Sequence, residues 1–227
     1  MTYDAVIFDL FGTLIDSANS EHLIRLFRDP VADLDCDADA FMSAWLGIYQ
    51  DRATGKFGSV ANEILYICRQ LGVEISDEQL QRVVEDRLQG FREHCTPRAS
   101  VPATLTRLRQ DGVKVGLVSD CGQEIPDIWQ DTELAPLIDA AVFSCSVGAT
   151  KPHPSLYQLA CKQLDVQPAR CMYVGDGGSR ELTGAAAVGM HPVLIRVGYE
   201  AFFDAHRADA VDWTGSVISD ISQVLEI

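Results

Sequence analysis

The feature that most constrains this chain is an apolar run near its start that ends on a carboxylate. Residues 6–10 read Val-Ile-Phe-Asp-Leu, and a Gly-Thr turn follows at Gly12 and Thr13. A short, continuous apolar run bounded by turn residues indicates a buried strand. In parallel sheets, ligands bind at the carboxyl ends of the strands. Asp9 is therefore a candidate nucleophile, a candidate metal ligand or an ordinary helix cap.

Three later segments show the same pattern of a strand-like run followed by polar residues. They are residues 113–118 before Ser119 and Asp120, residues 140–144 before Lys151 and Pro152, and residues 171–175 before Asp176, two glycines and Glu181. Beyond Pro97, strand-like runs alternate with helical patterns, and residues 192–197 form the last strand-like run. Such alternation predicts an α/β fold with a parallel sheet.

The stretch between the first two strand-like runs has a different character. It carries three apolar stripes at helical spacing: Phe41, Trp45, Ile48 and Tyr49; Val60, Ile64, Ile67 and Cys68; and Leu80, Val83, Val84, Leu88 and Phe91. Each stripe fits one face of an amphipathic helix. Asp37 or Asp39, Ser59 and Ser76 precede the stripes and can cap the helices. The sequence thus predicts a helical insert within the α/β fold.

Taken in order, the four motifs resemble those of the haloacid dehalogenase superfamily of hydrolases, from about residue 4 to residue 197. The resemblance implies a Rossmann-like, doubly wound parallel sheet with a small all-helical cap domain inserted after the first strand. We accordingly expect residues 1–16 and 98–227 to form the catalytic core, and residues 17–97 to form the cap.

The resemblance also implies roles for individual residues. Asp9 would be the nucleophile, since a carboxylate can form a covalent ester that water then cleaves. Lys151 would neutralise charge in the transition state, and Thr13 and Ser119 would donate hydrogen bonds to a bound anion. Mg²⁺ takes oxygen ligands, here implied to be Asp9, Asp176 and the main-chain carbonyl of Phe11. Glu181 would reach a metal-bound water or brace Lys151.

Phe11 is the main departure from the family pattern. Phosphatases of the family usually have Asp two residues after the nucleophile, as general acid and then base, and Phe cannot transfer a proton. An aromatic residue here is normal among the 2-haloacid dehalogenases, which need no metal, whereas the phosphonate-cleaving branch has a small residue. Three interpretations stay open: a magnesium-dependent phosphatase, which Asp176 and Glu181 favour; a dehalogenase or phosphonate hydrolase; and a non-enzymatic descendant.

The segment 49–58 of the insert is the predicted site of substrate selection. It concentrates Arg52 and Lys56 beside two aromatic residues and is interrupted by two glycines. Loops on a rigid scaffold often carry recognition, so Arg52 or Lys56 is a candidate contact for an anionic part of the substrate. An ordinary solvated turn is the alternative.

Composition narrows the class of partner. The net charge of −15 argues against nucleic acid and against an anionic membrane surface. The seven cysteines are odd in number and lack Cys-x-x-Cys spacing, so neither a disulfide framework nor a zinc site is expected. No signal peptide or run of some 18 apolar residues is evident, which favours a cytoplasmic location. The expected partner is a small anionic substrate; the sequence does not indicate an oligomeric state.

Overall fold

The fold is built on a parallel sheet of six strands in the order β3-β2-β1-β4-β5-β6. The computed structural model describes residues 3–196 and 207–227. The strands are β1 (Ala5–Phe8), β2 (Lys114–Ser119), β3 (Ala140–Phe143), β4 (Cys171–Gly175), β5 (His191–Ile195) and β6 (Ser216–Ile218). The predicted α/β class and parallel sheet are confirmed. Strand β6 was not predicted, and residue 197, the expected end of the fifth strand, lies outside the described residues.

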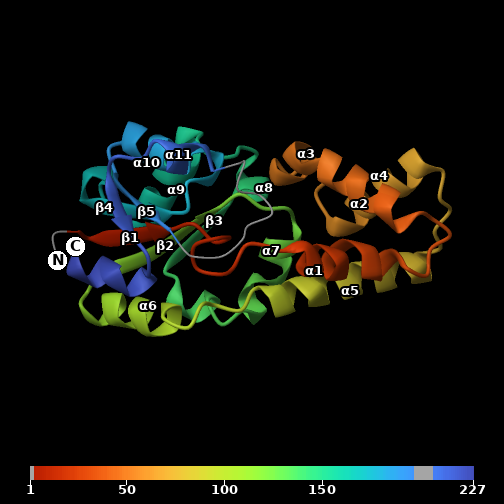
Figure 1. Cartoon of the computed structure of the whole chain (residues 1–227), viewed down its shortest axis with the longest axis horizontal. Coiled ribbons are helices and arrows are strands. Elements are labelled where there is room, and N and C mark those ends of the chain that lie inside the picture. Colours follow the sequence, from red (N-terminus) through yellow and green to blue (C-terminus); the bar gives the residue numbers. More distant parts are fainter. Residues whose placement is uncertain (1–2, 197–206) are drawn as a thin grey trace.

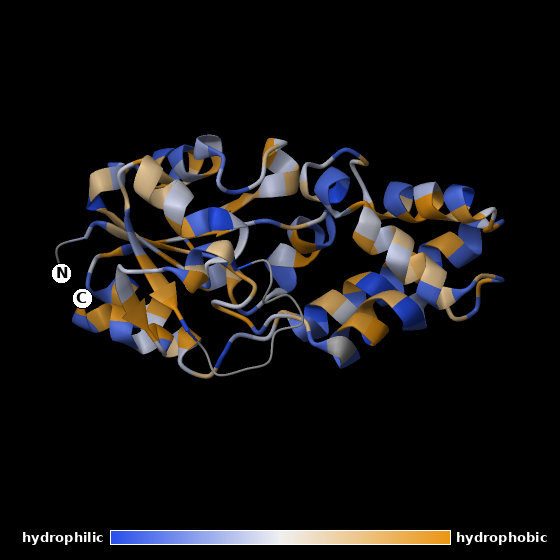
Figure 2. Cartoon of the chain, turned by 45° about the horizontal axis from the view of Figure 1, so that its top comes forward, coloured by the Kyte–Doolittle hydropathy of each residue, from blue (hydrophilic) through white to orange (hydrophobic). Residues whose placement is uncertain are grey.

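Helices cover both faces of this sheet (Figures 1 and 2), which explains why the central strands β1 and β4 are continuous apolar runs. Residues of β1 alternate between the faces: Val6 and Phe8 belong to one hydrophobic cluster, and Ala5 and Ile7 to the other. The covering elements are α6 (Val101–Gln110) and the 3₁₀ turn Ile221–Glu226 on the first face, and α9 (Pro154–Leu164) and α10 (Glu181–Ala187) on the second. The sheet is thereby a rigid platform for the residues at its carboxyl edge.

The chain between β1 and β2 forms a helical insert, which lies to the right of the sheet in Figure 1. Its α-helices are α1 (Ser20–Leu23), α2 (Ala38–Gly47), α3 (Tyr49–Ala53), α4 (Val60–Leu71) and α5 (Asp77–His94). Asp37, Ser59 and Ser76 cap α2, α4 and α5 through their side chains, as their positions predicted. The first stripe is divided between two helices at Ile48, and the segment 49–58 begins with helix α3 where the sequence predicted a loop.

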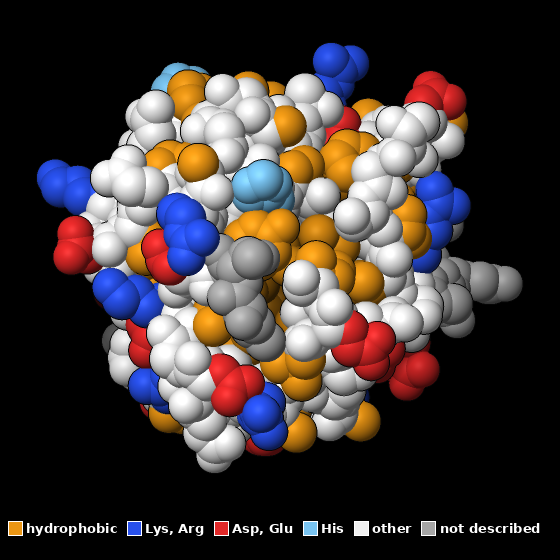
Figure 3. Space-filling model, turned by 90° about the vertical axis from the view of Figure 1, so that its left-hand side faces the viewer, with side chains coloured by type: hydrophobic (Ala, Val, Ile, Leu, Met, Phe, Trp, Pro, Cys, Tyr) orange, Lys and Arg blue, Asp and Glu red, His pale blue; other side chains and the backbone are white. Residues whose placement is uncertain are grey.

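Short helices complete the carboxyl edge of the sheet. These are α7 (Glu124–Ile128) after β2, α8 (Ser144–Val147) after β3, and α11 (Ala208–Val211) before β6. The opposite end of the molecule, seen in Figure 3, is a mixed surface with charged side chains of both signs around its edge. The exact division into core and cap stays a prediction.

Within the described residues, no helix is both long and apolar enough to cross a membrane. The predicted cytoplasmic location, and the exclusion of nucleic-acid and membrane partners, stay predictions.

Candidate active site

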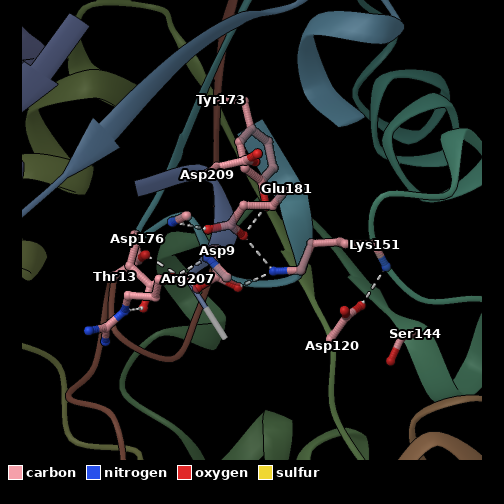
Figure 4. Close-up of polar contacts among 12 residues, drawn as sticks. Asp9, Thr13, Asp120, Ser144, Lys151, Tyr173, Asp176, Glu181, Arg207 and Asp209 are labelled. Carbon is pink, nitrogen blue, oxygen red and sulfur yellow. Dashed lines mark hydrogen bonds and ion pairs between the residues drawn. The ribbon is translucent and has the colours of Figure 1, made fainter. Parts of the chain in front are cut away.

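Three buried carboxylates meet at the carboxyl edge of the sheet (Figure 4). Asp9 follows β1, Asp176 follows β4, and Glu181 begins α10. Their ligand oxygens all lie within 4.8 Å of one another. Since β1 and β4 pair in parallel, with Phe8 opposite Val174, the residues that follow the two strands are brought together. Two sequence motifs far apart in the chain therefore form one site.

Asp9 is held in place by the strand beside it. Its backbone N–H donates to the carbonyl of Val174 at 2.9 Å, and its carboxylate is almost fully buried. Burial raises the pKa of Asp9 to about 6, with Asp176 adding to the rise and Lys151 opposing it. A carboxylate that is this poorly solvated is a stronger nucleophile than one in water, provided that cations stabilise its charge.

Lys151 provides one such cation. Its Nζ donates to Asp9 Oδ1 at 2.5 Å and to Glu181 Oε2 at 2.6 Å. Burial opposes the charge of Lys151, but Asp9 and Glu181 outweigh it, so its pKa is raised well above the ordinary value. Asp120, which follows β2, accepts a hydrogen bond from the Lys151 backbone N–H at 2.9 Å. Lys151 is therefore positioned by one carboxylate at its backbone and by two at its side chain.

Glu181 is the brace for Lys151, which was one of the two roles expected of it. Both carboxylate oxygens are engaged: Oε1 accepts from the Gly177 N–H at 2.9 Å, and Oε2 accepts from Tyr173 Oη at 2.9 Å as well as from Lys151. Burial raises the pKa of Glu181 well above its usual range, with Asp9 contributing. With its oxygens committed to these donors, Glu181 fixes where the ammonium of Lys151 lies.

Asp176 is oriented by a different set of donors. Its Oδ1 accepts from the backbone N–H of Gly178 at 2.9 Å, and its Oδ2 accepts from Arg207 Nε at 2.7 Å. Gly12 passes so close that a Cβ atom there would overlap Oδ2, and Gly12 also has a φ of +83°. Both facts require glycine in the turn after Asp9.

Two hydroxyl groups complete the site. Thr13 Oγ1 donates to Asp9 Oδ2 at 3.2 Å. Ser119 ends β2, beside β1, and is fully buried. Among the described residues, its Oγ has no hydrogen-bond partner. A buried hydroxyl without a partner is costly, and a bound anion would satisfy it.

Comparison with known proteins places this site in a family. The model of the haloacid dehalogenase-like hydrolases matches residues 3–189, which is most of the chain. The chain belongs to the haloacid dehalogenase-like hydrolases. The resemblance seen in its motifs is thereby confirmed.

Individual relatives include both phosphatases and dehalogenases. The chain is similar to the glyceraldehyde 3-phosphate phosphatase of Pyrococcus furiosus, with 32% identity over 55% of the chain and 51% of that protein. It is similar to the N-acetylmuramic acid 6-phosphate phosphatase of Pseudomonas aeruginosa, with 24% identity over 97% of the chain and 92% of the relative. Its fold resembles that of a 2-haloacid dehalogenase from Pseudomonas syringae pv. tomato, with a TM-score of 0.73, 20% identity and coverage of 99% and 97%.

The match to the first of these relatives is partial. The chain spans only about half the length of the P. furiosus phosphatase.

Phe11 gives this haloacid dehalogenase-like hydrolase no proton donor at the usual position. The nearby His94, in the last turn of α5, stacks on the Phe11 ring with 6.1 Å between centroids. Burial, with the neighbouring His22, lowers the pKa of His94 to about 4. His94 is therefore neutral at neutral pH and does not supply an imidazolium acid in place of the missing Asp.

The two cations predicted to bind substrate each pair with carboxylates of the chain. Arg52 is 2% exposed; its Nε donates to Glu63 at 2.7 Å and its Nη2 to Glu124 at 2.7 and 2.9 Å. Two buried carboxylates thus neutralise the charge of Arg52. We therefore correct the predicted substrate contact: Arg52 instead joins the insert to α7 through its ion pair with Glu124. Lys56 has a side chain that is 60% exposed and pairs with Asp51 at 2.7 Å. Its substrate-binding role stays a prediction.

Sequence reasoning missed Tyr173 and Arg207, the partners of Glu181 and Asp176. Tyr173 sits within the apolar run of β4, where an aromatic residue suggests core packing. Arg207 lies 31 positions after Asp176 and belongs to no motif. Neither position carries a local signal, because each acts through a contact made by the folded chain.

Proposed function

We propose that this hydrolase is a magnesium-dependent phosphatase that acts on a small phosphorylated metabolite, with Asp9 as its nucleophile. The observation that carries the proposal is the buried carboxylate cluster of Asp9, Asp176 and Glu181, with Lys151 bonded to two of its members. A dehalogenase releases halide without needing a metal, so that activity would not require a second buried carboxylate, Asp176, beside the nucleophile.

The donor set fits a divalent cation. Its atoms are carboxylate oxygens within 4.8 Å of one another, the ligand type that Mg²⁺ prefers. Three acids face two cations, Lys151 and Arg207, so full ionisation of the acids leaves one excess negative charge in the cluster. Asp9, Asp176 and the main-chain carbonyl of Phe11 would hold the metal. When bound, it would screen the negative charges of the phosphoryl group and of the nucleophile.

The chain's own residues account for the other elements of the reaction. A carboxylate oxygen of Asp9 attacks phosphorus, and the bond from phosphorus to the leaving oxygen breaks. The leaving group departs as an anion that takes a proton from solvent, and an acyl phosphate forms on Asp9. Water then attacks this phosphorus, which releases inorganic phosphate and restores the carboxylate. Lys151 stabilises the charge that develops, and the hydroxyl groups of Thr13 and Ser119 can donate to the phosphoryl oxygens.

The leaving group receives no proton from position 11. We therefore expect the first step to favour leaving groups that are stable as anions, so that aryl and acyl phosphates react much faster than alkyl phosphates. A proton donor at this position is worth roughly two to four orders of magnitude in rate. A steep dependence of kcat/KM on leaving-group pKa is the expected result, and a flat dependence would show that another group or a water supplies the proton.

Hydrolysis of a phosphate-ester panel and of 2-chloropropionate, each with and without EDTA, tests the proposal. We expect turnover of the phosphate esters that EDTA removes and Mg²⁺ restores. Asp9→Asn should abolish it while the variant still unfolds cooperatively on heating, because the amide has nearly the same shape but is no nucleophile. Dechlorination that EDTA does not affect would refute the phosphatase proposal.

That last outcome would support a 2-haloacid dehalogenase, the second candidate. Phe11 is the observation that favours it, since halide leaves without a proton.

We expect the insert to select the substrate. Two contacts place its segment 49–58 beside the Lys151 loop: Gln50 Nε2 donates to Thr150 Oγ1 at 3.3 Å, and Gly55 packs against the carbonyl of Cys145. Lys56→Ala should lower kcat/KM on the best substrate of the panel but not on a minimal phosphate ester. Equal losses on both would argue against recognition by Lys56.

A further inference from the structure

Arg207 occupies the carboxylate that the metal would use. Its Nε donates to Asp176 Oδ2 at 2.7 Å, and its Nη2 donates to Ser17 Oγ at 3.3 Å, in the chain that leads from the nucleophile to the insert. The two side chains of the ion pair are 17% and 10% exposed. A guanidinium is thus held inside the site, on one of the two acids expected to be direct metal ligands.

The backbone that follows Arg207 is hydrogen-bonded to the loop that carries Asp176 and to helix α10. Asp209, two residues later, accepts from Thr183 at its backbone N–H, 2.9 Å, and at its hydroxyl, 2.6 Å. The backbone N–H of Asp209 donates to the carbonyl of Gly177 at 3.2 Å. Ala210 lies so near Gly177 that a Cβ there would come within 2.9 Å of the Ala210 nitrogen. These contacts fix α11 on the loop that carries Asp176, so the ion pair is built into the fold.

The charges of the cluster are divided between two internal cations. Lys151 forms ion pairs with Asp9 and Glu181, and Arg207 forms one with Asp176. A divalent ion that binds between Asp9 and Asp176 must share Asp176 with a guanidinium of the same sign. Like charges at such separations repel strongly in a poorly solvated site, so the metal and the Arg207 contact disfavour each other.

We propose that Arg207 is an internal counter-ion of Asp176 that the metal displaces, so that this positioning residue sets the affinity and selectivity of the site for divalent cations. The inference rests on the proposed magnesium dependence and adds to it a competitor within the chain. Without metal, Arg207 holds the carboxylate of Asp176 in place. With metal, the carboxylate changes partner and the guanidinium is released.

Calorimetric titration with Mg²⁺ in the absence of substrate tests the competition. Arg207→Gln should lower the Kd for Mg²⁺ by about tenfold or more, the scale of one charge-assisted hydrogen bond. Arg98→Gln removes the same charge close by, where the guanidinium bonds to Asp16 and to the carbonyl of Gly12. Arg170→Gln breaks a similar ion pair, with Asp4, at the other end of β1. Both controls should change the Kd by no more than about twofold.

A spectroscopic signal follows the displacement directly. The ¹⁵N–¹H resonance of Arg207 Nε, assigned by its loss in Arg207→Gln, should shift on Mg²⁺ addition and exchange faster with water. The Nε of Arg170, which donates to Asp4 at 3.1 Å, is the internal reference and should not move.

The outcomes separate this inference from the proposed function. If the wild type binds Mg²⁺ and Arg207→Gln binds it equally or more weakly, or if Arg98→Gln tightens binding as much, the competition is refuted and the magnesium site stands. If neither the wild type nor Arg207→Gln binds Mg²⁺, the metal site and the competition are both refuted. Measurable Mg²⁺ binding by Arg207→Gln but not by the wild type would support the competition, because Arg207 would then exclude the ion altogether.

Discussion

Replacement of Glu124 by Gln should destabilise the junction between the insert and α7. Glu124 begins α7 and accepts two hydrogen bonds from Arg52, while Arg87 Nη1 lies 3.7 Å from the same carboxylate. The side chains of Arg52, Glu63, Arg87 and Glu124 are at most 2% exposed. Two buried guanidinium ions of the insert, those of Arg52 and Arg87, are therefore neutralised by the carboxylates of Glu124 and Glu63.

The magnitude follows from what the substitution leaves behind. Glu124→Gln keeps the shape but leaves two buried cations with Glu63 as their remaining acidic partner. Removal of one member of a buried ion pair costs about 3–5 kcal/mol. We expect the lower end, about 3 kcal/mol, because Gln can still accept a hydrogen bond from Arg52 and the Trp45 ring lies 3.3 Å from its guanidinium carbon. In a chain of this size, that corresponds to a fall in Tm of about 6–12 °C.

Thermal and urea unfolding of the wild type and the variant measure this loss. Glu133→Gln, the same change at an exposed position, is the matched control and should leave Tm unchanged within about 1 °C. Adding Arg87→Met to Glu124→Gln should recover part of the stability, because it removes a cation that has lost its carboxylate. A loss below about 1 kcal/mol for Glu124→Gln would show that the cluster does not hold the insert in place.

Three further predictions concern the pH dependence, the turn and the cation. Burial raises the pKa of Glu63 from 4.5 to about 7, so between these pH values the folded chain keeps a proton that the unfolded chain has lost. The free energy of unfolding should therefore fall as pH rises from 4.5 to about 7. Urea unfolding of Glu63→Gln should lack this pH dependence. Gly12→Ala should cost about 1–3 kcal/mol through its positive φ and also displace Asp176; Gly58→Ala, with a φ of +72° and open space around it, should destabilise without weakening Mg²⁺ binding. Lys151→Met should lower kcat by roughly 10²–10³-fold with a smaller change in KM, and a variant that loses only affinity would mean that this cation acts on the bound substrate alone.

Local signals determined much of the fold. Continuous apolar runs mark β1, β2 and β4 because strands buried on both faces need no polar residues. Asp37, Ser59 and Ser76 mark the starts of helices because a cap satisfies N–H groups only two or three residues away. Asp9 and Asp176 were found for the same reason: each follows a strand-like run directly, and parallel pairing brings the ends of such runs to one edge.

The tertiary structure alone decided the partners of Arg52 and Arg207. Arg52 lies in a polar segment that predicts an exposed loop, yet it is buried because Glu63 and Glu124 approach it from α4 and α7. Arg207 reaches Asp176 only because α11 packs on the loop that carries Asp176. A charge can pair with any opposite charge that folding brings within a few ångströms, and sequence separation carries almost no information about which one that is. The sequence by itself therefore determined which acids could react and that Lys151 would lie with them. Only the folded chain determined which carboxylates pair with Arg52 and Arg207.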